Sequence, residues 1–255
     1  MLSCTVQTGH TITLPHPPAR IISLVPSQTE LLYDLGLNEQ VAGITKFCIH
    51  PEEWFRTKTR VGGTKQLKMD IIHRLQPDLI IANKEENVKE QIEELAKSFP
   101  VWTSDISNLS DALAMITAIG LITGKEKEAA SIVKKITDNF ATLPKRTLRK
   151  AVYLIWQKPF MCAGGDTFIS SMMETAGFAN VFTHKKRYPE LTPDEIAASE
   201  AEYILLSSEP FPFKQKHRDE IIALFPAQEV ILVDGELFSW YGSRLLHAPE
   251  YFGKL

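Results

Sequence analysis

The chain has 255 residues and a formal net charge of -3, and its 44% hydrophobic and 23% charged content is that of an ordinary globular protein. The near-neutral charge argues against a nucleic-acid-binding surface, which requires a clustered excess of Lys and Arg. No apolar run approaches the roughly 18 residues that a membrane-spanning helix needs. The length suffices for one large domain or for two lobes of about 110 residues each.

The three cysteines, Cys4, Cys48 and Cys162, are too few and too scattered for a disulfide framework or a paired zinc-type spacing. The first residues, from Met1 to Cys4, lack the basic and apolar regions of a secretory signal. We therefore expect either that the chain works in the cytoplasm or that a signal was removed from it.

Short apolar runs alternate with amphipathic stretches in the first hundred residues. Residues 4–7 and 11–14 are expected to form a hairpin, and the continuous apolar run 20–25 is typical of a buried parallel strand. Ser27 should cap the helix that follows, with Glu30 completing a capping box. Further strands are expected at 41–45, 79–82 and 101–103, and further helices at 69–76, 88–98 and 107–123.

Residues 125–143 predict one long amphipathic helix in the middle of the chain. Thr123 and Glu126 fit a capping box at its start, and Pro144 ends it. We interpret this helix as a stiff rod between two α/β lobes, with 1–106 and 144–255 as the lobes and 107–143 as connecting helices. Function is then expected in the cleft between the lobes. The apolar stripe consists of Ala129, Ile132, Val133, Ile136, Phe140 and Leu143.

The second half repeats the pattern of the first, with strands at 151–157, 203–207 and 230–233 and helices between them. Strands that alternate with helices indicate mainly parallel sheets covered on both faces. The predicted fold class is therefore α/β, with two lobes joined by one long backbone helix. The helices of this half are expected at 168–176, 194–199, 216–224 and 244–252.

One internal echo relates the two halves. Asp70 opens a short helix and Asp78 follows eight residues later, just before a strand; Asp194 and Glu202 repeat this arrangement. Acidic residues favour helix N-termini for reasons of capping and the helix dipole, so a structural role and a paired functional role stay open.

Ligands of open α/β sheets bind beyond the carboxyl ends of the strands, so the residues that follow each strand are the candidates. They are rich in aromatic rings, which suits a flat, largely apolar ligand oriented by a few polar groups. We expect Phe211, Phe213 and Phe238 to be core or loop anchors. The candidate ligand-binding residues are Ser27, Phe47, His50, Trp156, Phe160, Tyr188, Trp240, Tyr241 and Arg244.

Evidence for a metal centre or a catalytic site is weak. Cys48 and His50 form a lone Cys-x-His, short of the three or four ligands that a metal site needs, although His50 alone could be an axial ligand to a metal held in a macrocycle. Catalytic motifs such as Gly-x-Ser-x-Gly and the Walker loop are absent from the sequence. The Gly164–Asp166 turn either receives an anion or is a tight strand-to-helix connection.

Five stretches together resemble the iron-siderophore and cobalamin substrate-binding proteins of ABC importers, a family of helical-backbone metal receptors. The resemblance covers nearly the whole chain, and within the family it is nearest to proteins labelled cobalamin-binding. The stretches are Gly9–Pro15 (GHTITLP), Pro18–Glu30 (PARIISLVPSQTE), Val61–Gly63, Leu75–Ile81 (LQPDLII) and Phe238–Arg244 (FSWYGSR).

The resemblance implies a non-enzymatic, monomeric receptor outside the cytoplasm, whose ligand is a corrinoid, a haem or a ferric siderophore, with no covalent cofactor. It implies that Asp70 and Asp194 dock onto arginines of an ABC permease, where a carboxylate–Arg contact is strong and selective. It also implies that the ligand cleft is lined by Phe47, Phe160, Tyr188 and the Trp240–Tyr241 loop.

The chain departs from the cobalamin binders at two places. Gly63-Thr64 stands where they often carry a Trp, and His50 stands where an aromatic residue is common. These departures leave the exact ligand open. Two other functions also stay open: a cytoplasmic corrinoid or tetrapyrrole carrier or sensor on the same scaffold, and a two-lobed enzyme such as a chelatase or a glycosyl transferase.

Overall fold

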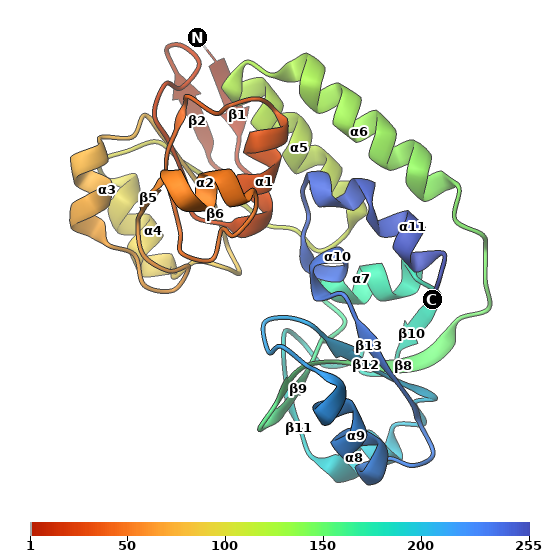
Figure 1. Ribbon diagram of the computed structural model, residues 1–255. Helices are drawn as coiled ribbons and strands as arrows, with labels where there is room; N and C mark the ends of the chain where they lie inside the picture. Colours follow the sequence, from red (N-terminus) through yellow and green to blue (C-terminus); the bar gives the residue numbers. More distant parts are fainter. Residues whose placement is uncertain (1) are drawn as a thin grey trace. The chain divides into compact units, whose positions relative to one another are not determined.

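The computed structural model describes residues 2–255, which form two compact units (Figure 1). The first unit contains the chain up to Ile106, then Ser110–Thr137 and Tyr241–Leu246. The second unit contains Ser107–Leu109, Asp138–Trp240 and His247–Leu255. Each unit is built around its own mainly parallel sheet, which confirms the predicted fold class.

The first unit holds a five-stranded parallel sheet in the order β5-β4-β3-β6-β7. The chain moves from β3 to one side of the sheet and returns to β6 on the other side, so the topological switch point lies between these two strands. Its strands are β3 (Ile21–Ser23), β4 (Val41–Ile44), β5 (Thr59–Arg60), β6 (Leu79–Asn83) and β7 (Val101–Ser104), and a hairpin is formed by β1 (Leu2–Thr5) and β2 (Thr11–Leu14). Its helices are α1 (Pro26–Asp34), α2 (Glu52–Thr57), α3 (Met69–Leu75), α4 (Lys89–Ala96) and α5 (Leu109–Thr123).

The second unit holds a mixed sheet in the order β11-β9-β8-β12-β13, with β10 pairing in parallel with the start of β8. The chain runs from β8 to β10 on one side and then to β12 on the other, so the switch point lies between β8 and β12. The strands are β8 (Arg149–Gln157), β9 (Phe160–Cys162), β10 (Phe178–Asn180), β11 (Glu190–Leu191), β12 (Tyr203–Ser207) and β13 (Glu229–Val233). The helices are α7 (Phe168–Thr175), α8 (Pro193–Ala198), α9 (Gln215–Leu224), α10 (Gly235–Ser239) and α11 (Ala248–Phe252).

Helix α6 (Glu126–Ala141) carries the chain from the first unit into the second, because the boundary between the units falls at 137/138 within it. Ala129, Ile132 and Ile136 are buried, as the predicted stripe requires. The predicted capping box is wrong: Thr123 ends α5, and its hydroxyl donates to the carbonyl of Ile119 at 2.6 Å. The threonine is thus engaged by the preceding helix.

Two further local predictions are wrong for identifiable reasons. Helix α1 has Val25 as its N-cap and Pro26 in its first turn, so Ser27 lies inside the helix and does not cap it. The predicted closing helix 244–252 is divided into a 3-10 helix, Ser243–Leu246, and α11. Pro249 lies in the first turn of α11, and its missing N–H cannot support a continuous helix through that point.

The second acid of each echo has a structural role. Asp78 accepts hydrogen bonds from the backbone nitrogens of Ala19 and Arg20, both at 2.8 Å, immediately before β3. Glu202 accepts one from the backbone nitrogen of Lys150 at 3.3 Å, at the start of β8. Asp78 therefore ties the start of β3 to the segment before β6. Glu202 likewise ties the start of β8 to the segment before β12.

Replacing Asp78 by Ala should destabilise the first unit by about 1–2 kcal/mol, because two charge-assisted hydrogen bonds to the backbone are lost. Glu202→Ala should cost less, since its bond is single and longer. Chemical denaturation of both variants against the wild type checks this, and an equal or smaller loss for Asp78→Ala would contradict it.

Candidate functional site

The switch point of the first unit is built on a buried amide and hydroxyl network. The side-chain nitrogens of Gln28 and Asn83 donate to the Ser104 hydroxyl at 2.6 and 2.9 Å, joining α1 to the carboxyl ends of β6 and β7. Asn87 donates to the carbonyls of Leu24 and Thr64, at 3.4 and 3.1 Å. The loops after β3 and β6 are thereby fixed relative to one another.

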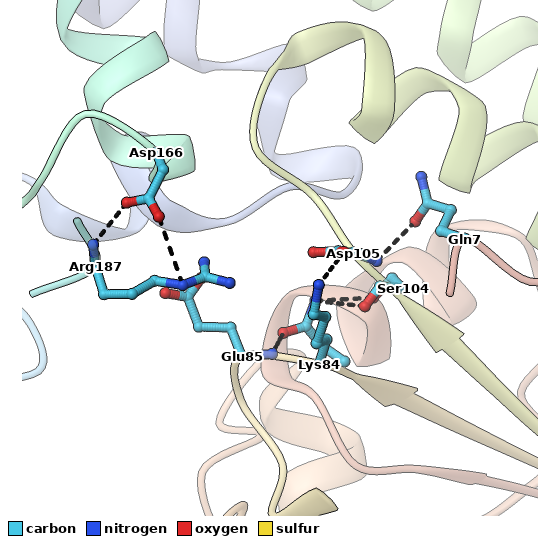
Figure 2. A network of polar contacts seen from close by, with 8 residues as sticks. Gln7, Lys84, Glu85, Ser104, Asp105, Asp166 and Arg187 are labelled. Carbon is cyan, nitrogen blue, oxygen red and sulfur yellow. Dashed lines mark hydrogen bonds and ion pairs between the residues drawn. The ribbon is translucent and has the colours of Figure 1, made fainter. Parts of the chain in front are cut away.

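Charged groups surround this network. Lys84 lies 2.5 Å from Asp105, whose backbone nitrogen donates to the Gln7 side chain at 3.2 Å (Figure 2). Burial raises the pKa of Glu86 in the neighbouring loop, although Lys65 opposes the shift. The carboxyl edge of this sheet therefore presents both signs of charge around a polar base.

Chain segment 241–246 joins this unit through an ion pair. Arg244 donates from Nε and Nη2 to the two carboxylate oxygens of Glu30, at 2.8 and 2.6 Å, and both side chains are less than one-fifth exposed. Gly242 lies so close to α1 that a Cβ there would approach the Ser27 carbonyl oxygen to 2.5 Å. The structure thus brings Ser27, Tyr241 and Arg244 into one unit, with Ser27 and Tyr241 buried.

The loop after β4 presents an exposed aromatic ring. Phe47 is 51% exposed, and Lys46 Nζ lies 5.0 Å from the centre of its ring. A Cβ at Gly63 would come within 3.1 Å of that ring, so the glycine leaves room for it. Phe47 therefore lies on this surface with its apolar area open to solvent.

Cys48 and His50 lie in different surroundings. The Cys48 sulfur is buried beside the hydroxyls of Thr29 and Thr45, at 3.0 and 3.2 Å, and burial raises the pKa of the thiol. His50 is partly exposed. Among residues 2–255 there is no cluster of three or more His, Cys, Asp or Glu side chains suited to a metal ion.

The second unit presents an aromatic cluster at its own switch point. Trp156, at the end of β8, is 38% exposed and meets Phe211 edge-on with 5.3 Å between ring centres. Phe211 in turn contacts the rings of Phe213 and His217. Phe213 and Phe238 are buried, which confirms that they are core residues, and Phe211 packs against the core while supporting Trp156.

The other aromatic candidates of this unit are less exposed. Trp240 is buried, and its indole nitrogen donates to Glu209 at 2.9 Å, which also accepts from Ser239 at 2.5 Å. Tyr188 is partly buried in the loop that follows β10. Phe160 lies in the wall of an open hollow of about 460 Å³, whose other lining residues are Gln157, Lys158, Pro159, Glu190, Leu191, Thr192, Pro193 and Glu195.

The two acids at helix starts are exposed. Asp70 lies in the first turn of α3 with its side chain 70% exposed, 3.1 Å from Arg74. Asp194 is exposed in the first turn of α8, whose capping box is supplied by Thr192 and Glu195. Asp194 is therefore not needed as the cap of its helix.

Several structural contacts around these candidates could not be identified from the sequence. In the sequence, Glu30 was already explained as part of a capping box with Ser27. Nothing therefore pointed to its ion pair with Arg244, which is 214 residues away. Glu209 is the second residue after β12, and its place at this strand end was the available signal for its contact with Trp240.

Comparison with known proteins identifies the family. The sequence profile described as periplasmic binding protein matches residues 21–226. The chain belongs to the periplasmic binding protein family. It is similar to a vitamin B12-binding protein of Yersinia pestis (strain Pestoides F), at 24% identity over 94% of this chain and 87% of that protein. It is also similar to the uncharacterized ABC transporter substrate-binding lipoprotein YvrC of Bacillus subtilis, at 24% identity over 94% and 80%.

Solved structures of periplasmic binding proteins share the fold. The vitamin B12 binding protein BtuF of Vibrio cholerae superposes with a TM-score of 0.80 at 20% identity, covering 94% of this chain and 97% of its own. The heme binding protein HutB of Vibrio cholerae gives 0.75 at 19%, covering 92% and 97%. The family is one of binding proteins and not of enzymes, which confirms the expected absence of catalysis. No helix among residues 2–255 combines the length and apolar character needed to cross a membrane.

The Glu30–Arg244 pair should couple by about 1–2 kcal/mol, because it is bidentate and mostly shielded from water. A double-mutant cycle with Glu30→Gln and Arg244→Met, measured by chemical denaturation, gives the coupling energy. If the free-energy change of the double variant equals the sum of the two single changes, the contact does not stabilise the first unit.

Stability should also respond to acid through Glu195. Its hydrogen bond from Lys185, together with the Thr192 backbone, lowers the pKa of this carboxyl to about 2. A lowered pKa contributes stability above the ordinary value near 4.5 and loses it as the pH falls towards 2. Glu195→Gln should therefore lose less thermal stability than the wild type between pH 5 and pH 2, and parallel melting curves would contradict this.

Proposed function

We propose that this protein binds a metal-bearing ligand of the corrinoid, haem or ferric-siderophore class and presents it to an ABC permease for uptake. The names of its relatives support the proposal, since they include vitamin B12-binding and heme-binding proteins and an ABC transporter substrate-binding lipoprotein. Their periplasmic or lipoprotein character supports a location outside the cytoplasm.

The observation that carries the proposal is a pair of exposed aromatic rings, Phe47 and Trp156. Phe47 lies beyond the carboxyl end of β4, and Trp156 lies at the carboxyl end of β8. Strand β8 borders the switch point of its sheet, and β4 is one strand away from the switch point of its own. Large aromatic side chains are usually buried in part against protein, and each can bury on the order of 150–250 Å² against a partner. A flat ligand with an apolar face would cover this area.

The remaining candidates complete the proposed site. Ser27, Tyr241 and Arg244 in the first unit and Phe160, Tyr188 and Trp240 in the second would border the ligand, while His50 would act as an axial ligand to its metal. Asp70 and Asp194 would contact permease arginines; their exposure and the independent capping of α8 support this role.

Titration of the purified protein with hydroxocobalamin, dicyanocobinamide, haemin and a ferric hydroxamate, followed by the visible spectrum and by tryptophan fluorescence, tests the proposal. We expect saturable binding of at least one of these ligands, with quenching of Trp156. No spectral or fluorescence change with any of them would contradict it.

Phe47→Ala and Trp156→Ala should each weaken binding by about tenfold or more, since each removes a ring whose burial is worth roughly 1.5–3 kcal/mol. Phe55→Ala is the matched control in the first unit, because Phe55 is also exposed but lies in α2 against Arg60. Leu224→Ala is the corresponding control in the second unit, because Leu224 is also an exposed apolar residue. Equal losses in the controls would show that the two rings have no special role.

A further inference from the structure

The imidazole of His217 caps the start of α9 in the second unit. Lys214 is the N-cap of this helix and His217 is its third residue. The backbone N–H of Lys214 donates to Nδ1 of His217 at 3.0 Å, which is the contact that a Glu or Gln makes at the third position of a capping box. Because a backbone N–H can only donate, Nδ1 carries no proton here, and the ring is neutral with its proton on Nε2.

One aromatic side chain connects this ring to the exposed indole of Trp156. His217 lies 5.0 Å from Phe211 between ring centres, and Phe211 meets Trp156 edge-on at 5.3 Å. The other neighbour of the imidazole is Phe213, which is buried in the core and lies 5.9 Å away. Contacts between rings depend on their relative orientation. The orientation of Trp156 therefore depends on Phe211, and that of Phe211 depends in part on His217.

Hydrogen bonds also join α9 and the loop before it to the end of β8. The side-chain nitrogen of Gln157 donates to Glu220 of α9 at 2.8 Å. The backbone nitrogen of Phe211 donates to the Ile155 carbonyl at 3.3 Å. These bonds lie on both sides of Trp156 in the sequence, so a change at the start of α9 is transmitted to the strand end that carries the indole.

Protonation of His217 is incompatible with this arrangement. A proton on Nδ1 would place two donors opposite one another and would remove the capping contact. The imidazolium would also add a positive charge to the N-terminal end of a helix, where the dipole already disfavours cations. The side chain is only partly buried, so protons reach it from solvent.

The charged groups around His217 do not compensate for that added charge. Lys214, Lys216 and Arg218 already stand at the start of α9, and its described first turn holds no acid. The neighbouring carboxylates accept hydrogen bonds from other residues, which are Ser239 and Trp240 for Glu209, Gln215 for Asp219 and Gln157 for Glu220. The charged side chains of the surrounding elements are Lys158 in the β8–β9 turn, Glu209 and Lys214 in the loop after β12, and Lys216, Arg218, Asp219 and Glu220 in α9.

We propose that His217 is a positioning residue for Trp156: its neutral ring holds the indole in the orientation that binds the ligand, and protonation of the ring releases it. The consequence for the ligand rests on the proposed function. Because only the neutral ring makes the contact, the contribution is present at the alkaline end of the range in which histidines ordinarily titrate, roughly pH 5–8, and is lost at the acidic end.

Acrylamide quenching of the ligand-free protein tests the positioning role without any ligand. Comparison with Trp156→Phe in each background isolates the fluorescence of Trp156 from that of the other tryptophans. The quenching of Trp156 should change between pH 7.5 and pH 5.0 in the wild type and stay constant in His217→Gln, since glutamine keeps its acceptor at both pH values. His73→Gln is the matched control and should keep the wild-type response, because His73 also contacts a ring, that of Phe99 at 5.2 Å, but lies in the first unit.

NMR of the imidazole nitrogens tests the protonation state directly. The signals that are present in the wild type and missing from His217→Gln belong to His217. At pH 7.5 they should show Nδ1 without a proton and Nε2 with one, and at pH 5.0 both nitrogens should be protonated.

Titration with hydroxocobalamin, dicyanocobinamide, haemin and a ferric hydroxamate at both pH values tests the effect on binding. For each ligand that binds, the affinity of the wild type should fall by about threefold or more relative to His217→Gln between pH 7.5 and pH 5.0, as expected for the loss of one hydrogen bond. Any titration of the ligand itself is common to both proteins and cancels in this ratio. Thermal unfolding at each pH confirms that both proteins are folded.

A protonated Nδ1 at pH 7.5, or a pH response of His217→Gln equal to that of the wild type, would overturn the role of His217 while leaving the proposed function intact. If the wild type binds none of the four ligands, the proposed function fails together with the effect on affinity. The quenching of Trp156 then still decides whether His217 positions the indole.

Discussion

Each sheet is wound in two directions from a central parallel strand, β3 in the first unit and β8 in the second. At the switch point of each sheet, the connections from two adjacent strands run to opposite sides of the sheet. The space beyond the carboxyl ends of these two strands is therefore not covered by a connection. The polar base formed by Gln28, Asn83 and Ser104 lies at one such edge, and the Trp156–Phe211 contact lies at the other. The proposed ligand site follows from this constraint.

Residues far apart in the sequence maintain that arrangement. Asp78 and Glu202 tie the beginnings of β3 and β8 to the segments before their neighbours, so the register of the central strands is fixed at the amino edge. Arg244 joins the end of the chain to Glu30 on α1, at the opposite edge. The exposed rings at the carboxyl edges therefore stand on a backbone that such contacts hold in place.

The elements that could be predicted from the sequence are those with an unambiguous period or a continuous apolar run. The strand Tyr203–Ser207 has the predicted bounds, and three residues of the predicted α6 stripe, Ala129, Ile132 and Ile136, are buried. Short elements such as α2, β5 and β10 were not predicted, because two to six residues carry too little pattern. Capping boxes were predicted wrongly at Ser27 and Thr123, since long-range packing decided the partners of the residues involved.

The candidate site could be predicted in part. The rule for carboxyl ends of strands selected Phe47 and Trp156, but sequence alone could not show that these rings are exposed while Trp240 is buried against Glu209. The contact of Asp166 with the backbone of Arg187, 21 residues later, was likewise not predicted. Such features arise from the path of the backbone and leave no local pattern.

The most direct measurement of the central claim is amide hydrogen exchange with and without bound ligand. The account predicts protection in the loops that follow β3, β4, β8 and β12, and none in the segments that precede β4 and β13. Protection at those amino edges, with the loops around Phe47 and Trp156 unchanged, would contradict it.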